Sequence, residues 1–387
     1  MRIISLHGIS VSETSVSDFQ QALDNLRLPD QGYLWLACSR SEFGQMQVPI
    51  QAMLDRLCGL QLMELHVSDL LNQQLPSRYD YTSQYDLLVF RRLAASVASA
   101  QPPSDATLES SAKRRGPPIL RQIDTSPVGF VVFDRVLLTV HPQEDATRDS
   151  YALRLLAAGS SQTSSELSAA GPDGRSAGAR GVPTSPADLM LRIINHMVDG
   201  FLALRRELSR QLDHWQGELL DPKSRFVNWS TLLDARLSLH QLDEVCEDQL
   251  SAIEDWIEAL KGWPESDGQA SQHERDMLQV RSRDVLEHIE RVVSHVHQLG
   301  RNAEAAVQIH FNAQSHRTNE IMRTLTALTA IFLPMNFVTG FFGMNFEFLP
   351  LIHQQRGLWW AIGVMLMVVL VLVLVFWRKR YLTRTSR

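Results

Sequence analysis

The sequence predicts an α+β cytosolic domain, a long helical stalk and two C-terminal transmembrane helices. Three observations lead to this expectation. Strand-like runs mix with helical periodicity in roughly the first 150 residues, the pattern becomes helical from residue 185 onward, and two stretches near the C-terminus contain no charged residue. At 387 residues, the chain is also longer than one ordinary domain.

The first predicted domain covers residues 1–184. Strand-like runs occur at 32–38, 86–91, 128–134 and 135–140, and a helical pattern covers 49–72. Two stretches rich in Ser, Gly, Pro and Ala interrupt this pattern, at about 101–118 and 157–186. We expect both to be mobile surface insertions, because such compositions bury little apolar surface.

The predicted stalk covers residues 185–323. Helical patterns run over 186–219, over 229–260 and from about 272 onward, and Gly300 is the one interruption of the third run before the apolar region. If this third helix continues to residue 342, it contains some 70 residues and is about 105 Å long. One helix would then form both the stalk and the first membrane span.

Two uncharged stretches predict the membrane spans, although charged residues make up 21% of the chain. They cover 324–346 and 357–377, and each is long enough to cross a hydrocarbon layer of about 30 Å. The second is apolar on every face. The first contains Pro334, Asn336 and several threonines, which membrane helices keep chiefly where other helices or a water-filled lumen satisfy them.

The charge distribution predicts the topology of these spans. Five basic residues lie in the tail at 378–387, namely Arg378, Lys379, Arg380, Arg384 and Arg387, whereas the loop at 347–356 has only Glu347 and Arg356 as charged residues. By the positive-inside rule, both termini are cytosolic and the protein is a multi-pass protein of the inner (plasma) membrane. Residues 1–6 suggest a strand rather than a signal peptide. The net charge of −6 gives no reason to expect nucleic acid as a partner.

One face of the first predicted span carries a stripe of polar and small residues. At 100° per residue, its members fall within a sector of about 100°; they are Asn319, Met322, Thr326, Thr329, Leu333, Asn336 and Gly340. We call this set the polar stripe. It is consistent with a helix-packing seam or with the lining of a pore, in which side-chain oxygens meet a hydrated cation and Met322 and Leu333 form apolar constrictions. The pore interpretation requires several copies around a closed symmetry axis.

The polar stripe ends in Gly-Phe-Phe-Gly-Met-Asn at residues 340–345. With the segments at 319–322, 325–326 and 331–334, the short loop, the second span and the basic tail, this region resembles the CorA family of magnesium and cobalt channels over roughly 315–380. The resemblance implies a homopentamer with a funnel-shaped cytosolic assembly. It also implies that the first span lines the pore, that Gly343, Met344 and Asn345 form the selectivity motif, and that Asn319 lies near the inner mouth.

The chemistry of magnesium agrees with this motif. Mg²⁺ gives up its water reluctantly and prefers six oxygens, so a filter should bind the hydrated ion. A ring of Asn345 amide oxygens offers neutral acceptors to that water, and the carbonyls at the helix C-terminus add partial negative charge.

Two departures from the family pattern leave the transported ion open. The loop has Glu347, but Leu351 stands where a second acidic residue is common, and Asn336 stands where threonine is more usual. From the resemblance we expect a passive channel for Mg²⁺ and Co²⁺ driven by the membrane potential. Because of the two departures, a Zn²⁺ transporter of the related ZntB type is the alternative. An alternative of another class is a two-span membrane anchor for a coiled signalling module.

An acidic run at 243–258 is the candidate for a cytosolic metal sensor. It contains no basic residue, and a solvated helix face is its ordinary interpretation. The alternative is that Asp243, Glu247, Glu254 and Glu258 bind regulatory Mg²⁺, because carboxylate oxygens suit this ion. Six histidines lie on the third helical run without the spacing of a complete metal site; they are His273, His288, His295, His297, His310 and His316.

The sequence gives no indication of an enzyme. It contains no P-loop, nucleophile elbow or zinc-hydrolase motif, so we expect neither catalysis nor ATP-driven pumping. We expect no cofactor beyond a transported or regulatory Mg²⁺, Co²⁺ or Zn²⁺. The isolated cysteines Cys38, Cys58 and Cys246 are expected to be reduced cytosolic thiols.

Overall fold

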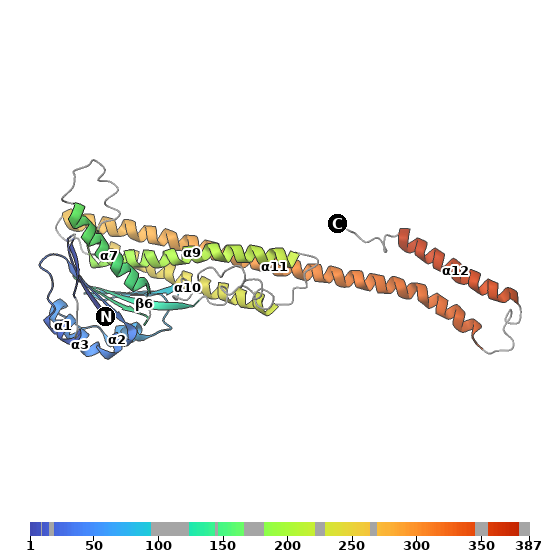
Figure 1. Cartoon of the computed structure of the whole chain (residues 1–387), viewed down its shortest axis with the longest axis horizontal. Helices are drawn as coiled ribbons and strands as arrows, with labels where there is room; N and C mark the ends of the chain where they lie inside the picture. The colour runs from blue at the N-terminus through green and yellow to red at the C-terminus, as the bar shows by residue number, and fades with distance from the viewer. Residues whose placement is uncertain are drawn as a thin grey trace. The chain divides into compact units, whose positions relative to one another are not determined.

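The computed structural model describes residues 1–8, 10–14, 19–93, 124–143, 146–165, 182–220, 229–263, 269–344 and 355–378. The chain divides into two compact units, Met1–Ala303 and Glu304–Arg387. Figure 1 labels the helices and strands along the chain. We describe each unit by itself.

A mixed β-sheet organises the first unit. Its seven strands lie in the order β2-β1-β3-β7-β6-β5-β4. Their bounds are β1 Arg2–His7, β2 Ser10–Glu13, β3 Tyr33–Ser39, β4 Arg78–Tyr81, β5 Asp86–Leu93, β6 Thr125–Val132 and β7 Val136–His141. The neighbours are antiparallel except for β3 and β7, which pair in parallel with Leu34 opposite Val136. The four predicted strands are confirmed as β3, β5, β6 and β7, within a few residues at each end.

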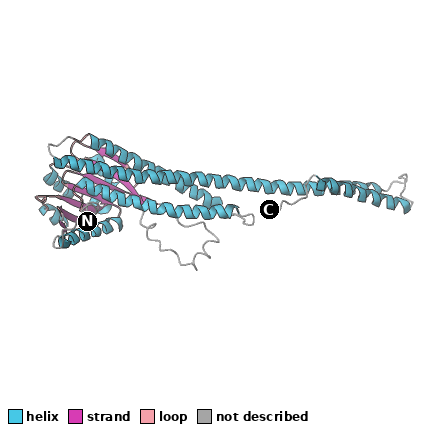
Figure 2. Ribbon diagram, turned by 90° about the horizontal axis from the view of Figure 1, so that it is seen from above, coloured by secondary structure: helices cyan, strands magenta, loops and turns pink. Residues whose placement is uncertain are grey.

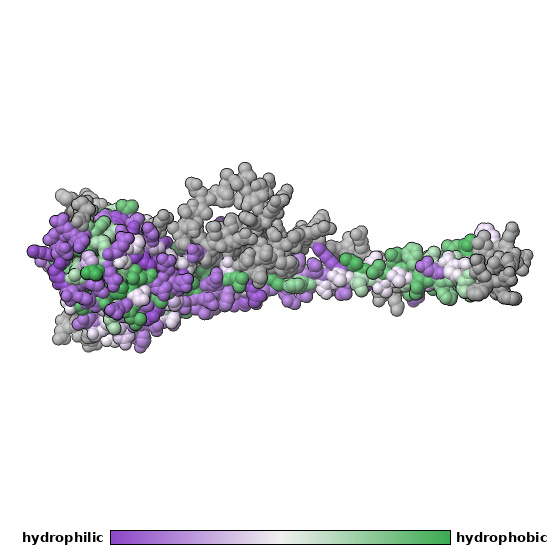
Figure 3. Space-filling model, turned by 90° about the horizontal axis from the view of Figure 1, so that it is seen from below, coloured by the Kyte–Doolittle hydropathy of each residue, from purple (hydrophilic) through white to green (hydrophobic). Residues whose placement is uncertain are grey.

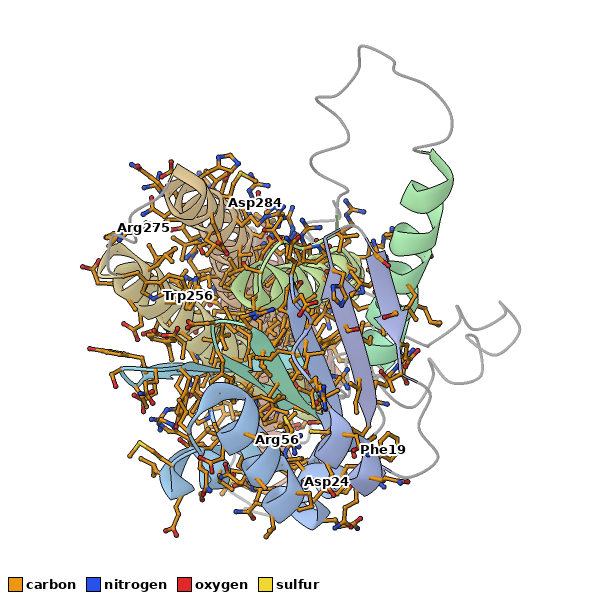
Figure 4. The ribbon with its side chains drawn as sticks, turned by 90° about the vertical axis from the view of Figure 1, so that its left-hand side faces the viewer. Phe19, Asp24, Arg56, Trp256, Arg275 and Asp284 are labelled. Atoms are coloured by element: carbon orange, nitrogen blue, oxygen red, sulfur yellow. The ribbon has the colours of Figure 1, made fainter. Side chains whose placement is uncertain are left out.

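The central strand β3 is buried on both faces, which explains its continuous apolar sequence. Side chains alternate between the two faces of a strand. Leu34 and Leu36 accordingly contact one hydrophobic cluster, whereas Tyr33 and Trp35 contact the other. Each face of the sheet therefore needs a covering layer of helices (Figure 4).

Four short helices cover one face of the sheet. They are α1 Phe19–Asn25, α2 Arg40–Gln45, α3 Gln47–Cys58 and α4 Glu64–Leu71. Ser39 begins α2 with a capping box, in which its side chain accepts from the backbone of Glu42 and Glu42 accepts in turn from the backbone of Ser39. Phe43, Ile50 and Met53 from these helices are buried in the same hydrophobic cluster as Leu34 and Leu36 of β3.

Longer helices cover the opposite face (Figure 2). They are α7 Ala146–Ser165, α9 Pro186–Leu220, α10 Trp229–Lys261 and the first part of α11 Gln269–Phe342. The three helices predicted for the stalk are thus confirmed as α9, α10 and α11. The 74-residue α11 runs through Gly300 and Pro334 without interruption.

The prediction of an insertion at 157–186 is wrong at both ends. Residues 157–165 form the second half of α7, where Gly159 lies so close to Val11 that an added Cβ would be 3.0 Å from its side chain. Val182 is 8% exposed and belongs to the core, and α9 begins at Pro186. Alanine and serine are compatible with a helix when one face packs, and Ala152 and Leu155 provide that face. The predicted insertion at 101–118, like 166–181, lies outside the described residues.

The second unit contains the remainder of α11 and α12, Gln355–Arg378. Most of its described side chains are apolar, in contrast to the hydrophilic surface of the first unit (Figure 3). Within the described residues, the helix at Gln272–Phe341 includes a window long and apolar enough to cross a membrane, and 6% of that window is buried. The described apolar stretch of α12, Ile362–Val375, is shorter. The second predicted span at 357–377 therefore falls entirely within α12, whose apolar stretch Ile362–Val375 is shorter than that of α11.

Candidate functional site

The polar stripe lies on an exposed face of α11. All seven of its residues are exposed, and Met322 and Leu333 have exposed fractions of 57% and 68%. Ala327 is 4% exposed, and Ile331 and Pro334 on the same side of the helix are half-buried. The end of α11 lies beside α12 (Figures 1 and 2). At 100° per residue, the polar stripe is centred roughly 145° from this less exposed face.

The threonine hydroxyls of the polar stripe donate to the backbone of their own helix. Oγ1 of Thr326 donates to the carbonyl of Met322 at 2.7 Å, and Oγ1 of Thr329 donates to the carbonyl of Leu325 at 2.9 Å. A hydroxyl has one hydrogen and two lone pairs, so the oxygen remains an acceptor after it has donated. The exposed face of α11 therefore presents oxygen acceptors that can bind the hydrogens of metal-bound water.

The helix ends in a turn at the start of the Gly-Met-Asn motif. The backbone N–H of Gly343 donates to the carbonyl of Thr339 at 2.9 Å, and that of Met344 donates to Phe341 at 3.4 Å. A Cβ at residue 343 would lie 3.0 Å from the carbonyl oxygen of Thr339, so the turn favours glycine here. The predicted filter residue Asn345 and the predicted loop charge Glu347 lie outside the described residues.

The structure brings together two of the four predicted sensor carboxylates. Asp243 and Glu247 lie one turn apart on α10, and each is near the imidazole of His297 on α11. Glu254 and Glu258 are exposed further along α10, and Glu258 pairs with Lys261 at 2.6 Å. Glu254 is seven residues beyond Glu247, a distance of about 10 Å along the helix axis. The four residues therefore do not form one cluster within this chain.

Sequence reasoning placed His297 among six histidines without the spacing of a complete metal site and missed its position beside Asp243 and Glu247. No local spacing could have found it, because 50 residues separate Glu247 from His297 and the pairing depends on how α10 and α11 pack. The indole of Trp256 helps to fix this packing, since its Nε1 donates to the buried Ser282 hydroxyl of α11 at 2.9 Å. Figure 4 labels Trp256 on α10.

The neighbouring carboxylates of α10 line a pocket beside the C-terminal part of β5 and the beginning of β6. The pocket has a volume of about 340 Å³, and Arg91, Asp124, Glu244 and Asp248 are among its lining residues. Burial raises the pKa of the Asp248 carboxyl, and the charge of Glu244 raises it further. The guanidinium of Arg91 donates to the hydroxyl and the carbonyl of Thr125, at 2.9 and 2.8 Å, and so ties the pocket to β6.

The cysteines are unreactive thiols in this arrangement. Cys38 and Cys246 are buried, and Cys58 is half-buried. Burial raises the pKa of the Cys38 and Cys246 thiols to about 12 and that of Cys58 to about 11. Thiols with such values stay protonated near neutral pH and are poor metal ligands.

Comparison with proteins of known sequence places this chain beside metal transport proteins. The family described as CorA-like Mg²⁺ transporter protein matches residues 32–380. The cobalt/magnesium transport protein CorA of Thermotoga maritima is 24% identical over 200 residues, which are 50% of this chain and 52% of that protein. The putative metal ion transporter YfjQ of Bacillus subtilis is 43% identical over 63 residues, or 16% of this chain and 19% of that protein. The match thus spans about half the length of the Thermotoga protein and a smaller share of the Bacillus protein.

Solved structures show the fold. The CorA magnesium transporter of Methanocaldococcus jannaschii matches with a TM-score of 0.66 at 15% identity and covers 98% of each chain. The full-length CmaX protein matches with a TM-score of 0.64 at 18% identity, over 98% of this chain and 97% of that chain. The α/β unit, the long α11 and α12 are therefore arranged along the chain as in these proteins. Because the family match extends over most of its length, the chain belongs to the CorA-like Mg²⁺ transporter protein family.

Proposed function

We propose that the chain is one subunit of a passive divalent-cation channel, with Mg²⁺ and Co²⁺ as its ions. The observation that carries this proposal is the polar stripe of α11, which exposes oxygen acceptors on a helix otherwise apolar enough to enter a membrane. Polar groups in a membrane need partners. Several copies arranged around an axis would turn these faces toward a shared water-filled lumen.

Hydrated Mg²⁺ matches this lining. The ion holds its water in a tight octahedral shell, and the waters point hydrogens outward as donors. Thr326 and Thr329 have committed their hydroxyl hydrogens to the backbone, so their oxygens offer lone pairs to such donors. Asn336 and the motif residues Gly343, Met344 and Asn345 would extend this path, with Asn319 at the inner mouth and Met322 and Leu333 as gates.

The membrane potential supplies the driving force in this proposal. Two positive charges that move inward through about 100 mV gain about 4.6 kcal/mol. This free energy supports an accumulation of roughly 10³-fold without ATP. We place both termini in the cytosol of a cell with the protein in its inner membrane, since the basic tail follows the second span.

A Zn²⁺ transporter is the second candidate function. The loop contains Glu347 but Leu351 where a second acidic residue would make the mouth more negative, and it also contains His353. Imidazole favours zinc over magnesium. A less acidic mouth weakens the electrostatic attraction of every dication equally, so the case for zinc rests on His353 and leaves the channel proposal in place.

Metal uptake by the purified protein in liposomes tests both candidates. Uptake of Mg²⁺, Co²⁺, Ni²⁺ and Zn²⁺ is compared with an imposed potential alone and with an added proton gradient. The proposal expects potential-driven uptake of Mg²⁺ and Co²⁺ that needs no proton gradient, and Asn345→Ala should abolish it while the protein still assembles. Zinc uptake that requires the proton gradient would support the second candidate. Absence of uptake of all four ions by correctly assembled protein would support a membrane anchor.

A further inference from the structure

Two carboxylates of α10 and an imidazole of α11 converge at the edge of the seam between these helices. Nε2 of His297 lies 3.0 Å from Oδ1 of Asp243 and 3.7 Å from Oε1 of Glu247. One potential ligand atom from each residue lies within 4.8 Å of the other two. Asp243 and Glu247 are four residues apart, so the helix holds both on the same face.

The environment of Asp243 is a second observation. Its Oδ1 is buried and has no hydrogen-bond partner, although 24% of the side chain is exposed. The nearby imidazole nitrogen of His297 lies 3.0 Å from it without the alignment of a hydrogen bond. A buried polar atom without a hydrogen bond destabilises the fold. A cation bound between the three side chains would satisfy this oxygen.

The residues behind the cluster make it a defined position rather than part of a mobile surface. Leu242 and Cys246 on α10 and Val296 on α11 are almost fully buried beside it. Burial raises the pKa of the Cys246 thiol to about 12, and the charge of Asp243 adds to this effect. Cys246 bounds the cluster on its buried side, and its Sγ is not among the ligand atoms that converge there.

We propose that Asp243, Glu247 and His297 bind a transition-metal dication, with Zn²⁺ as the preferred ion. The donor set decides the class of metal, because imidazole together with carboxylates suits zinc, nickel and cobalt, whereas Mg²⁺ prefers oxygen ligands alone. Ligand atoms at about 2.0–2.2 Å around a tetrahedral zinc lie roughly 3.3 Å from one another. Atoms that already lie within 4.8 Å reach this geometry by small side-chain rotations, and water completes the shell.

Such a metal would link two helices of one subunit. Its ligands come from α10 and α11, and α11 is the helix that continues to Phe342. This arrangement differs from the four-carboxylate sensor that the sequence offered as an alternative to a solvated helix face, since Glu254 and Glu258 are not part of it. It also stands independently of the proposed function, because it requires neither transport nor assembly.

Metal titration of the purified full-length protein tests the proposal. After treatment with a chelator, the protein is titrated with Zn²⁺ by calorimetry and with Co²⁺ by visible absorption. We expect one tight equivalent per chain, which Asp243→Asn and His297→Gln lose or weaken by more than about 100-fold, because loss of an outer partner alone costs about 10–100-fold. The double variant His240→Gln/Glu244→Gln is the matched control, since it removes an exposed histidine–glutamate pair of α10 in which these groups lie 3.6 Å apart.

A lysine variant separates a metal site from a simple ion pair. His297→Lys places a positive charge beside both carboxylates but cannot bind zinc as imidazole does, so it should lose the tight equivalent and keep much of the thermal stability of the metal-free protein. Should Asp243→Asn unfold, Glu247→Gln replaces it, because Glu247 is 61% exposed. Equal Zn²⁺ affinity in the wild type, His297→Gln and His297→Lys would overturn the proposal. So would a wild-type protein that binds no tight equivalent.

Discussion

At the residue scale, the direction of a single hydroxyl hydrogen determines what α11 offers to an ion. Thr324, Thr326 and Thr329 each donate to the carbonyl four residues earlier, at distances of 2.7 to 2.9 Å. Each oxygen therefore keeps lone pairs for an outside donor. Thr326 and Thr329 belong to the polar stripe, whereas Thr324 lies on the opposite side of the helix.

The first prediction uses this difference between chemically identical residues. Thr326→Val and Thr329→Val keep the shape of the side chain and remove its acceptor. Each should lower Mg²⁺ flux about fivefold, because a lost hydrogen bond to the hydrated ion costs about 1 kcal/mol. Thr324→Val is the matched control and should leave flux unchanged. The measurement is uptake into liposomes at equal protein content. A comparable loss in all three variants would show that the hydroxyls act on the helix and not on the ion.

Asp188 carries the second prediction at this scale. Its side chain is 5% exposed and lies between Arg192 of α9 at 3.1 Å and Arg281 of α11 at 2.6 Å. Asp188→Asn removes the charge that both guanidiniums share, and breaking such a buried pair costs about 3–5 kcal/mol. Thermal unfolding of the purified protein should show this loss, whereas Asp199→Asn at an exposed site of α9 should have little effect. Equal stability of the two variants would contradict this role.

At the scale of elements, the helices of the first unit contact one another through polar pairs as well as apolar seams. Nε2 of His295 on α11 lies 2.8 Å from Oγ of Ser209 on α9. Burial lowers the pKa of the His295 imidazole, and the charge of Arg205 lowers it further. Burial likewise lowers the pKa of His196, with Arg154 as the next cause. Both imidazoles thus remain neutral in the fold at pH values where the unfolded chain already binds protons.

The third prediction follows from this difference between the two states. When the pKa of a histidine is lower in the folded state than the usual value of about 6.5, the unfolded chain binds its proton first as the pH falls. The stability of the fold is therefore complete above the unfolded pKa and decreases as the pH falls from there toward the folded pKa. The melting temperature should therefore fall between about pH 7.5 and pH 5.5. The double variant His196→Gln/His295→Gln should show a flatter profile over this range. If its profile has the same slope as that of the wild type, other groups cause the pH dependence.

The elements also show which patterns a sequence reveals. Strand β3 was predictable because a run apolar at every position indicates a strand buried on both faces. Strand β4, Arg78–Tyr81, was not predicted, because its polar side chains at the sheet edge give no apolar alternation. The second half of α7 was mistaken for an insertion because its serines and glycine resemble a linker, and only the contact of Gly159 with Val11 reveals its packing.

At the scale of the whole molecule, a single chain leaves the polar stripe uncovered. Its seven residues are exposed although the helix that carries them is apolar enough to cross a membrane. The stripe and the helix bounds could be predicted because both follow from periodicity along one helix. The position of His297 beside Asp243 could not, because it depends on contacts between helices far apart in the sequence.

The fourth prediction is a closed homo-oligomer, for which we propose five copies. Native mass spectrometry of the detergent-purified protein should show a species of about five times 43.8 kDa. Asn345→Ala should form the same species, because we propose a role for this amide in the filter and none in apolar packing. A monomer that still transports metal would contradict this prediction, since two helices cannot enclose a lumen.

The most direct test of a shared lumen is cadmium block of cysteine variants. A cysteine at Asn336 would face the copies of itself around the axis and form a ring of thiolates, which bind soft dications tightly. Thr339→Cys is the control, since Thr339 is exposed at nearly the same depth but outside the polar stripe. The three native cysteines should bind little Cd²⁺, because burial raises the pKa values of their thiols to about 11 or 12 and leaves few thiolates.

The measurement is Mg²⁺ flux into liposomes before and after addition of Cd²⁺, followed by a dithiol chelator. The account predicts that Cd²⁺ blocks Asn336→Cys reversibly at concentrations that leave Thr339→Cys and the wild type unaffected. Equal sensitivity of both variants, or no block of an active Asn336→Cys, would contradict a pore lined by this face of α11.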